Sequence, residues 1–496
     1  MKKGYIEQSK RKTILFLSDD CRLPSGIGTM TRELIIGNAH RFNFVQIAAA
    51  IQHPEAGKIF NLNEDINKQA GITDASVTLY PFDGYGNPEV VRGLIEKHSV
   101  DQIIHFTDPR YWIWLYRMSA ELRQKLPITY YHIWDDLPAP HYNKPYYESC
   151  DLLMGISKQS DNIAKIVLGK GNYIDLDAQP NADISKPVPK TCFVPHGINT
   201  KLFFPIEKTD ERVVSMRKKL FGDNQPEFVV LHNNRNIRRK MTSDLILAFK
   251  LMYDNVLDAK GLEFADKLRL VLHTQSVDEN GTHLPNVIKN VCPEVEHLIT
   301  ITDSKLSSEE LNILYNCSDV VANIASNEGW GLSSTEAMVT GTPIINNVTG
   351  GLQDQCRFED EKGEWIKFTE DFGSNHAGAY KKHGKWVKPI FPSTISIQGS
   401  VLTPYIFDDR CDSRDVRDAM LYWYSMSQVE RDECGAAGRA WAIGSEANFT
   451  AEAMCEKAGD MMAKLMVDWK PLPRFNMYNV REELEKTKNK KTGISL

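Results

Sequence analysis

Apolar residues in this chain gather in short runs that alternate with stretches of helical spacing. In the first part of the chain, short apolar runs of this kind predict buried strands of a parallel sheet. We expect these strands at residues 13–18, 44–48, 77–80, 102–106, 128–133, 152–156 and 192–194. Helical patterns lie between them, for example at residues 29–37, 90–98 and 111–124. Strands that alternate with helices indicate an α/β fold.

The same alternation begins again after a break at residues 204–209, where Pro205 interrupts the chain. Further strands are expected at residues 228–231, 268–274, 298–302, 320–322 and 343–346, and helices at 244–253, 307–317 and 334–340. We therefore predict an N-terminal α/β domain over residues 1–205 and a C-terminal one over residues 206–450.

Residues 355–403 break this pattern, because they are rich in Gly, Pro, Lys and aromatic residues and show little periodicity. We interpret them as an insertion in the second domain, and long loops of this kind often carry function. Residues 412–426 and 451–466 again have helical spacing. The segment 451–496 is predicted to be a C-terminal helix that packs back on the first domain, followed by a charged tail over 482–496.

The composition narrows the class of protein. The chain has 59 Lys and Arg against 65 Asp and Glu, a formal charge of −6, which excludes a polycation but not a local nucleic-acid surface. Nine scattered cysteines without a C-x-x-C pair argue against a disulfide framework and a zinc cluster. No run approaches the ~20 apolar residues of a membrane span. These features predict a cytoplasmic protein without integral membrane association.

The most informative segment is residues 328–351, E-G-W-G-L-S-S-T-E-A-M-V-T-G-T-P-I-I-N-N-V-T-G-G. Gly329 and Gly331 leave the backbone bare just before a predicted helix, whose free N–H groups suit a diphosphate. Glu328 and Glu336 flank this turn, so both carboxylates can face one ligand. An alternative stays open, because Ser333 and Glu336 also have the spacing of a helix capping box.

Two other segments are candidates for the same site. Residues 231–240, L-H-N-N-R-N-I-R-R-K, follow the first predicted strand of the second domain, and taken alone they are better explained as a basic surface loop. Gly26 and Gly28 follow the first strand of the chain. They lack the third glycine of a dinucleotide site, which disfavours an oxidoreductase.

Residues 328–351 resemble the family-four retaining glycosyltransferases. That family has two glutamates separated by seven residues, of which the first begins an E-G-x-G motif and the second begins E-A-M. The resemblance implies the glycosyltransferase B (GT-B) fold, in which two Rossmann-like domains face each other across a cleft. It also implies a nucleotide-sugar donor, most often a UDP-sugar, with no cofactor and no metal ion. The adjacent Asp pairs at 19–20, 135–136 and 408–409 agree with a reaction without metal, since none of them is a D-x-D motif.

The resemblance further implies roles for individual residues. Arg235 and Lys240, with Arg239 as a rival, are expected to clamp the donor diphosphate. His132 is expected beside the donor sugar, although a buried structural histidine is an equal alternative. The implied catalytic residues are Glu328, His132, Arg235 and Lys240, and the implied donor-binding residues are Gly26, Gly28, Arg239, Gly329, Gly331, Leu332, Ser333 and Glu336.

The acceptor is less constrained. Asp135 and Asp136 are candidates for binding acceptor hydroxyls, and His105 and Asp108 end another strand of the same domain. The chain is also similar to glycosyltransferases of T-even-type tailed phages, which implies 5-hydroxymethylcytosine in double-stranded DNA within the host cytoplasm as acceptor.

Residues 376–388 interleave aromatic and basic side chains, so Lys382 and Trp386 are candidates for contacting that DNA, or else belong to a solvated basic loop. Two further interpretations stay open. One is transfer to an envelope or lipid-linked saccharide, and the other is a non-catalytic protein that binds nucleotide sugars.

Overall fold

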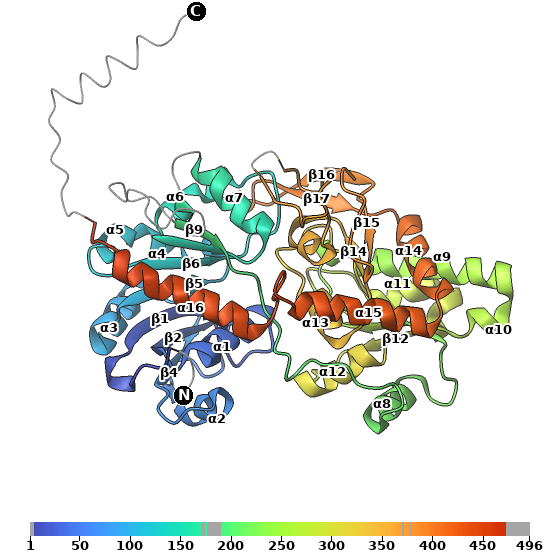
Figure 1. The fold of residues 1–496 in the computed structure, drawn as a ribbon, viewed down its shortest axis with the longest axis horizontal. Helices are drawn as coiled ribbons and strands as arrows, with labels where there is room; N and C mark the ends of the chain where they lie inside the picture. The colour runs from blue at the N-terminus through green and yellow to red at the C-terminus, as the bar shows by residue number, and fades with distance from the viewer. Residues whose placement is uncertain (1–3, 170–173, 176–189, 370–371, 377, 473–496) are drawn as a thin grey trace, which may run out of the picture.

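The computed structural model describes residues 4–169, 174–175, 190–369, 372–376 and 378–472. Two α/β domains lie side by side, and the chain runs through the first before entering the second (Figure 1). The predicted tail at 482–496 lies outside the described residues.

The first domain is built on one sheet with the strand order β3-β4-β2-β1-β5-β6-β7-β9-β8. All its strand pairs are parallel except that of β3 with β4. The central strands are buried on both faces, as their apolar runs predict. The strands are β1 (Lys12–Asp19), β2 (Phe42–Ala50), β3 (Phe60–Asn61), β4 (Val77–Asp83), β5 (Gln102–Phe106), β6 (Ile128–His132), β7 (Leu152–Gly155), β8 (Ile174–Asp175) and β9 (Lys190–Phe193).

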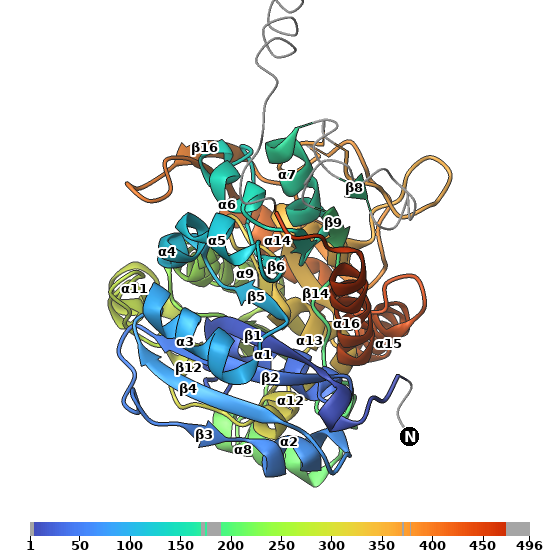
Figure 2. The ribbon, with the colours of Figure 1, turned by 90° about the vertical axis from the view of Figure 1, so that its left-hand side faces the viewer.

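Helices cover both faces of this sheet (Figure 2). They are α1 (Gly26–Asn38), α2 (Asn63–Ala70), α3 (Pro88–His98), α4 (Ile113–Arg117), α5 (Ser119–Leu122), α6 (Lys144–Glu148) and α7 (Lys158–Leu168), with short 3₁₀ turns η1 (Gln8–Lys10), η2 (Pro109–Trp112) and η3 (His141–Asn143). The single helix predicted over residues 111–124 is therefore wrong, because η2, α4 and α5 divide it.

The second domain has a parallel six-stranded sheet with the order β12-β11-β10-β13-β14-β15. Its strands are β10 (Phe228–Asn233), β11 (Leu268–His273), β12 (Ile299–Thr302), β13 (Val320–Asn323), β14 (Ile344–Asn347) and β15 (Val387–Ile390). The surrounding helices are α8 (Glu211–Phe221), α9 (Thr242–Lys260), α10 (Leu262–Ala265), α11 (Leu284–Val291), α12 (Ser308–Asn316), α13 (Leu332–Thr340), α14 (Ser413–Ser425) and α15 (Gln428–Ile443), with η4 (Arg238–Lys240), η5 (Pro293–Leu298) and η6 (Gly350–Cys356).

Regular structure continues inside the predicted insertion at residues 355–403. It supplies β15, the last strand of the second sheet, and most of an antiparallel hairpin of β16 (Thr394–Gln398) and β17 (Ile406–Arg410). The hairpin projects from the upper part of the second domain, beside the loops of the first (Figure 1). The hairpin belongs to the second domain, and its residues also contact the first domain, so it links the two.

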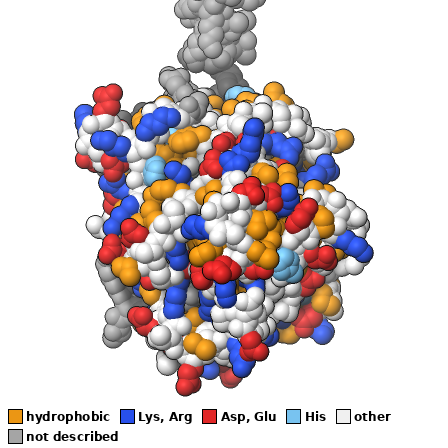
Figure 3. All heavy atoms as spheres, turned by 90° about the vertical axis from the view of Figure 1, so that its right-hand side faces the viewer, with side chains coloured by type: hydrophobic (Ala, Val, Ile, Leu, Met, Phe, Trp, Pro, Cys, Tyr) orange, Lys and Arg blue, Asp and Glu red, His pale blue; other side chains and the backbone are white. Residues whose placement is uncertain are grey.

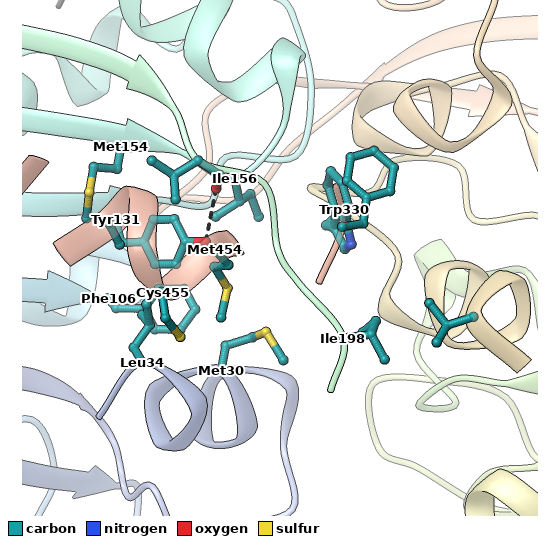
Figure 4. Packing of buried hydrophobic residues seen from close by; sticks show 14 of the residues in the cluster. Met30, Leu34, Phe106, Tyr131, Met154, Ile156, Ile198, Trp330, Met454 and Cys455 are labelled. Carbon is teal, nitrogen blue, oxygen red and sulfur yellow. Dashed lines mark hydrogen bonds between the residues drawn. The ribbon is translucent and has the colours of Figure 1, made fainter. Parts of the chain in front are cut away.

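The chain returns to the first domain in its last helix, α16 (Ala451–Asp468). The two segments that cross between the domains run side by side, since Ile198 N–H donates to Phe449 O at 2.9 Å and Ala451 N–H donates to Ile198 O at 3.0 Å. Helix α16 then packs against α1. Its Met454 and Cys455 enter a core that also contains Met30 and Tyr131 (Figure 4).

Candidate functional site

The loop between β13 and α13 places Glu328 at the carboxyl edge of the second sheet. Helix α13 begins after Gly331, whose φ of 88° is in the left-handed region that favours glycine. A Cβ atom at this position would also collide with Leu352. Both glycines of the motif therefore shape the start of the helix, and the first free N–H groups of α13 face the edge where the two domains meet.

Two basic residues hold the Glu328 carboxylate. Arg239 donates to it at 2.9 Å from Nη1, and Lys240 Nζ forms a second ion pair with the same oxygen. Although burial opposes ionisation, these two cations keep the pKa of Glu328 low, at about 2. Asp135 of the first domain lies 3.7 Å from Arg239. Glu328, Arg239, Lys240 and Asp135 therefore form one cluster of acidic and basic side chains that spans the two domains.

The structure places Arg235 outside this cluster. Its Nε donates to Asp278 at 2.8 Å, and its side chain is 60% exposed. Arg239 lies inside because its carbonyl oxygen accepts a hydrogen bond from Ser326 N–H at 2.8 Å, which ties η4 to the segment that precedes Glu328. Of the two arginines proposed for the diphosphate, the predicted rival Arg239 is the one beside Lys240 and Glu328.

Glu336 faces away from the start of its own helix. Tyr315 of α12 donates its hydroxyl to the Glu336 carboxylate at 2.5 Å, and Asn233 at the end of β10 donates to that hydroxyl at 2.8 Å. The described contacts include no capping box at α13, whose N-cap is Gly331 without a side-chain bond. Burial raises the pKa of Glu336 to about 7. Sequence reasoning missed Tyr315, which belongs to no recognisable motif, and Asn233, which lies in residues 231–240 beside the basic residues that drew attention to that segment.

Leu332 and Ser333 form the first turn of α13, next to the first domain. Ser333 is buried. A Cβ atom on Gly26, which opens α1 in the first domain, would lie 3.2 Å from Leu332. A Cβ atom on Gly329 would lie 2.8 Å from Ile133 O. Gly28 instead packs under its own loop, against the carbonyl oxygens of Leu23 and Asp20. Gly26 and Gly329 thus each lie where one domain packs closely against the other.

His132, the last residue of β6, is completely buried. Its Nε2 lies 2.7 Å from the Tyr147 hydroxyl, and burial lowers its pKa to about 3, so the ring is neutral at physiological pH. The ring packs edge-on against Tyr147 and Tyr130. The ring is therefore held in the core of the first domain, and its expected place beside the donor sugar stays a prediction.

Asp135 and Asp136 point to different surroundings. Asp135 faces Arg239 in the cluster, as described above. Asp136 is fully buried and accepts hydrogen bonds from Thr349 at 3.2 Å and from Ser374, which also bonds Asp409. Burial and the neighbouring Asp409 carboxylate raise the pKa of Asp136 well above its usual range. Asp136 is thus enclosed by protein groups in this structure, and its expected contact with an acceptor hydroxyl stays a prediction.

Trp386 likewise has a place in the core. Its ring is buried, stacks on Trp441 at 4.9 Å, and donates from Nε1 to Gln355 O at 2.9 Å. It precedes β15, at the amino end of a parallel strand, whereas Glu328 follows the carboxyl end of β13. The expected Trp386 contact with DNA is therefore wrong in this structure, because the ring is covered. Lys382 is exposed.

Two observations concern ions and membranes. Among the described residues, no group of three or more His, Cys, Asp or Glu side chains is arranged to hold a metal ion. None of the described helices combines the length and the apolar character that crossing a membrane requires.

Comparison with solved structures identifies the architecture. A sucrose-phosphate synthase from Thermosynechococcus elongatus superimposes with a TM-score of 0.62 at 16% identity, covering 92% of this chain and all of that one. The Anabaena protein HepE, in complex with UDP and glucose, gives a TM-score of 0.59 at 14% identity with the same coverage. The chain has the glycosyltransferase B fold. The fold class predicted from the sequence is confirmed.

Sequence comparison gives shorter matches to proteins whose names denote sugar transfer. The chain is 26% identical over 152 residues to an alpha-monoglucosyldiacylglycerol synthase of Acholeplasma laidlawii, and 24% identical over 161 residues to a mannosylfructose-phosphate synthase of Agrobacterium fabrum. These matches cover 31% and 32% of this chain and only about a third of each relative, 34% and 33%. No protein-family model matches the chain.

Proposed function

We propose that this GT-B protein is a glycosyltransferase that moves a sugar from a nucleoside diphosphate donor to a hydroxyl acceptor, with retention at the anomeric carbon. The observation that carries the proposal is the Glu328–Arg239–Lys240 cluster beside the start of α13. Two positive side chains lie there close to the start of a helix, whose first N–H groups are free, and this combination suits a diphosphate that gains charge as it leaves.

Each group in the cluster has a distinct task in this reaction. Arg239 and Lys240 bind the diphosphate oxygens, and Glu328 accepts hydrogen bonds from hydroxyls of the donor sugar. Glu336, held by Tyr315, accepts hydrogen bonds from the ribose. The acceptor oxygen attacks the anomeric carbon as its bond to phosphate breaks, and the acceptor proton passes to the leaving phosphate oxygen. Because attack and departure occur on one face, the configuration is retained.

The donor is proposed to be a UDP-sugar. Solved structures with the same fold include HepE in complex with UDP and with UDP-glucose. Helix α13 and the two basic residues supply the positive charge that a diphosphate requires, so we expect transfer without an added metal ion. Transfer that stops in EDTA would contradict this expectation.

Transfer to DNA, implied by the phage similarity, receives less support. Trp386 is covered, and acidic and basic side chains are interspersed over the outer face of the second domain (Figure 3). Binding to a duplex rests on a continuous basic surface. Among the described residues, intact Glu328, Glu336, Arg239 and Lys240 favour catalysis over a purely binding role.

The test is the exchange of Glu328 for Gln. We expect Glu328→Gln to lower UDP release from UDP-glucose or UDP-N-acetylglucosamine, measured with an acceptor panel, by about 10²–10³-fold, as for other lost transition-state contacts. Glu309→Gln, an exposed glutamate of α12, is the matched control and should retain wild-type turnover. Full activity in Glu328→Gln would overturn the proposal.

A further inference from the structure

Two tyrosines form a stacked pair at the carboxyl edge of the first sheet. Tyr85 follows β4 and Tyr111 lies in η2, just after β5. Their ring centroids are 4.6 Å apart, with an angle of 9° between the planes. Trp112 packs edge-on against Tyr85 at 5.7 Å, and Trp114 donates from its indole N–H to Tyr85 O at 3.2 Å. The pair is thus firmly held, while Tyr111 remains 50% exposed.

A carboxylate with spare hydrogen-bonding capacity lies beside this pair. Asp19 ends β1 at the carboxyl edge of the sheet, and the loop that follows it carries Ser25. Burial raises the pKa of Asp19 to about 6. Among the described residues no lysine or arginine forms an ion pair with it. The neighbouring Asp20 differs, since it is bonded by Arg22 at 2.6 Å and by His53 at 2.9 Å.

Asp19 and the tyrosines belong to one region. Strand β1 lies between β2 and β5, so Asp19 is level with Ala49, which is itself level with Phe82 just before Tyr85, and the adjacent Ser18 is level with Phe106, a few residues before Tyr111. The loop that follows Asp19 leads to Gly26, where a Cβ atom would lie 3.2 Å from Leu332 of α13. A group bound between Asp19 and Tyr111 would therefore lie next to the start of α13.

We propose that Asp19 and the Tyr85–Tyr111 pair form the acceptor subsite, and that the acceptor is an uncharged saccharide. This inference rests on the glycosyltransferase function proposed above. A carboxylate accepts hydrogen bonds from neighbouring hydroxyls of a sugar ring, and a half-exposed aromatic face packs against the ring C–H groups. A few polar groups beside an aromatic wall are the usual composition of a small-molecule site.

The charges around this subsite favour an uncharged acceptor over a phosphorylated one. Arg22 is held by Asp20 and by Glu55 at 2.8 Å, and Arg110 is held by Asp108. Both cations of this region are therefore neutralised, and Asp19 adds a negative charge above its pKa of about 6. A sugar phosphate or a DNA backbone would meet repulsion here, whereas a neutral sugar would not.

Saturation-transfer NMR tests the subsite independently of turnover. The probes are methyl α-glucoside, methyl α-mannoside, maltose and glucose 6-phosphate, each with and without saturating UDP. We expect at least one neutral sugar to bind, with the strongest transfer at its ring C–H protons. Binding should weaken at least 10-fold in Tyr111→Ala and at least 5-fold in Asp19→Asn. Tyr111→Phe keeps the aromatic face and should bind within twofold of wild type.

A failure of the subsite proposal can be told apart from a failure of the donor proposal. UDP affinity measured by calorimetry should be unchanged in all three variants, which also shows that they fold. If UDP does not bind the wild type, the donor proposal fails, and the sugar titrations without UDP still decide the subsite. The subsite proposal is overturned if none of the neutral sugars binds, or if binding is equal in Tyr111→Ala. It is also overturned if a 5-hydroxymethylcytosine duplex or diacylglycerol vesicles bind through Tyr111 instead.

Discussion

At the scale of single residues, Arg239 and Arg235 have opposite surroundings although only three residues separate them. Arg239 contacts Glu328, while Arg235 pairs with Asp278 near the surface. We expect Arg239→Ala to lower the rate of sugar transfer by about 10²-fold, because the leaving diphosphate loses a cation. Arg235→Ala should change it by less than about threefold. Steady-state UDP release measures both, and the reverse order would show that Arg235 is the diphosphate ligand.

Glu336 gives a second prediction at this scale. Its pKa is raised from 4.5 to about 7, so the folded protein holds this proton more tightly than the unfolded chain. Its contribution to the free energy of unfolding is full below pH 4.5 and falls as pH rises through 7, by up to about 3 kcal/mol. Urea unfolding at pH 5 and pH 7.5 should show a smaller loss for Glu336→Gln than for wild type. Equal losses would contradict the assignment.

The sequence alone could not decide which basic residue of a motif lies in the site. The spacing of Glu328 and Glu336 indicates a donor site, and the structure brings Glu328 together with Lys240 and Arg239. Arg239 is tied to the site by a main-chain bond from Ser326, and Arg235 is drawn away by Asp278, and both partners lie far along the chain. Local sequence cannot report these contacts. The same holds for Asp136, whose partners Ser374 and Asp409 come from distant segments.

At the scale of elements, the β16–β17 hairpin joins the two domains. Phe407 N–H donates to Leu137 O at 2.7 Å, and Tyr405 donates to Ala139 O at 3.1 Å. On its other side, Asp408 accepts from Ser326 at 2.8 Å and from Asn327 at 3.0 Å, next to Glu328. The hairpin thus fastens the first domain to the loop that carries the motif glutamate.

This fastening predicts the effect of Tyr405→Ala, which removes the bond to Ala139 and the edge-on contact with Tyr142. We expect open conformations to become more populated, with a larger radius of gyration in small-angle scattering and roughly fivefold weaker UDP binding. Val401→Ser is the matched control, since Val401 lies in the same hairpin and is 97% exposed. Equal UDP affinity in the two variants would show that the hairpin does not control closure.

The sequence predicts helices and strands whose hydrophobic pattern is strong, and it misses those whose pattern is weak. The apolar runs of β1, β5 and β10 are buried on both faces, so the sequence alone marks them. Helix α15 escaped notice, because it contains Gly435 and Gly438 and has mixed polarity. Those glycines let α15 approach Gly341 and Trp386 closely, a reason that appears only in three dimensions. The hairpin strand β16 is mostly exposed and has no core pattern to detect.

At the scale of the whole molecule, the paired crossings at Ile198 and Thr450 fix how the domains are connected. A Cβ atom on Gly197 would overlap the carbonyl group of Thr450. We expect Gly197→Ala to lower the free energy of unfolding by roughly 1–3 kcal/mol, the cost of overpacking. Gly93→Ala on α3, where a Cβ atom meets nothing within 4 Å, should be neutral or stabilising. Thermal unfolding measures both, and equal melting temperatures would contradict the tight crossing.

The return of α16 to the first domain has a consequence for how the protein is made. Met454 and Cys455 pack in the same core as Met30, and a Cβ atom on Gly37 would strike Cys455. During synthesis, the sheet of the first domain leaves the ribosome long before this helix exists. Its α1 face therefore stays uncovered until residues 451–468 have been translated. Ribosome-stalled chains that end before residue 450 should bind hydrophobic dyes and chaperones, and stalled chains in which α16 has left the ribosome should bind them less.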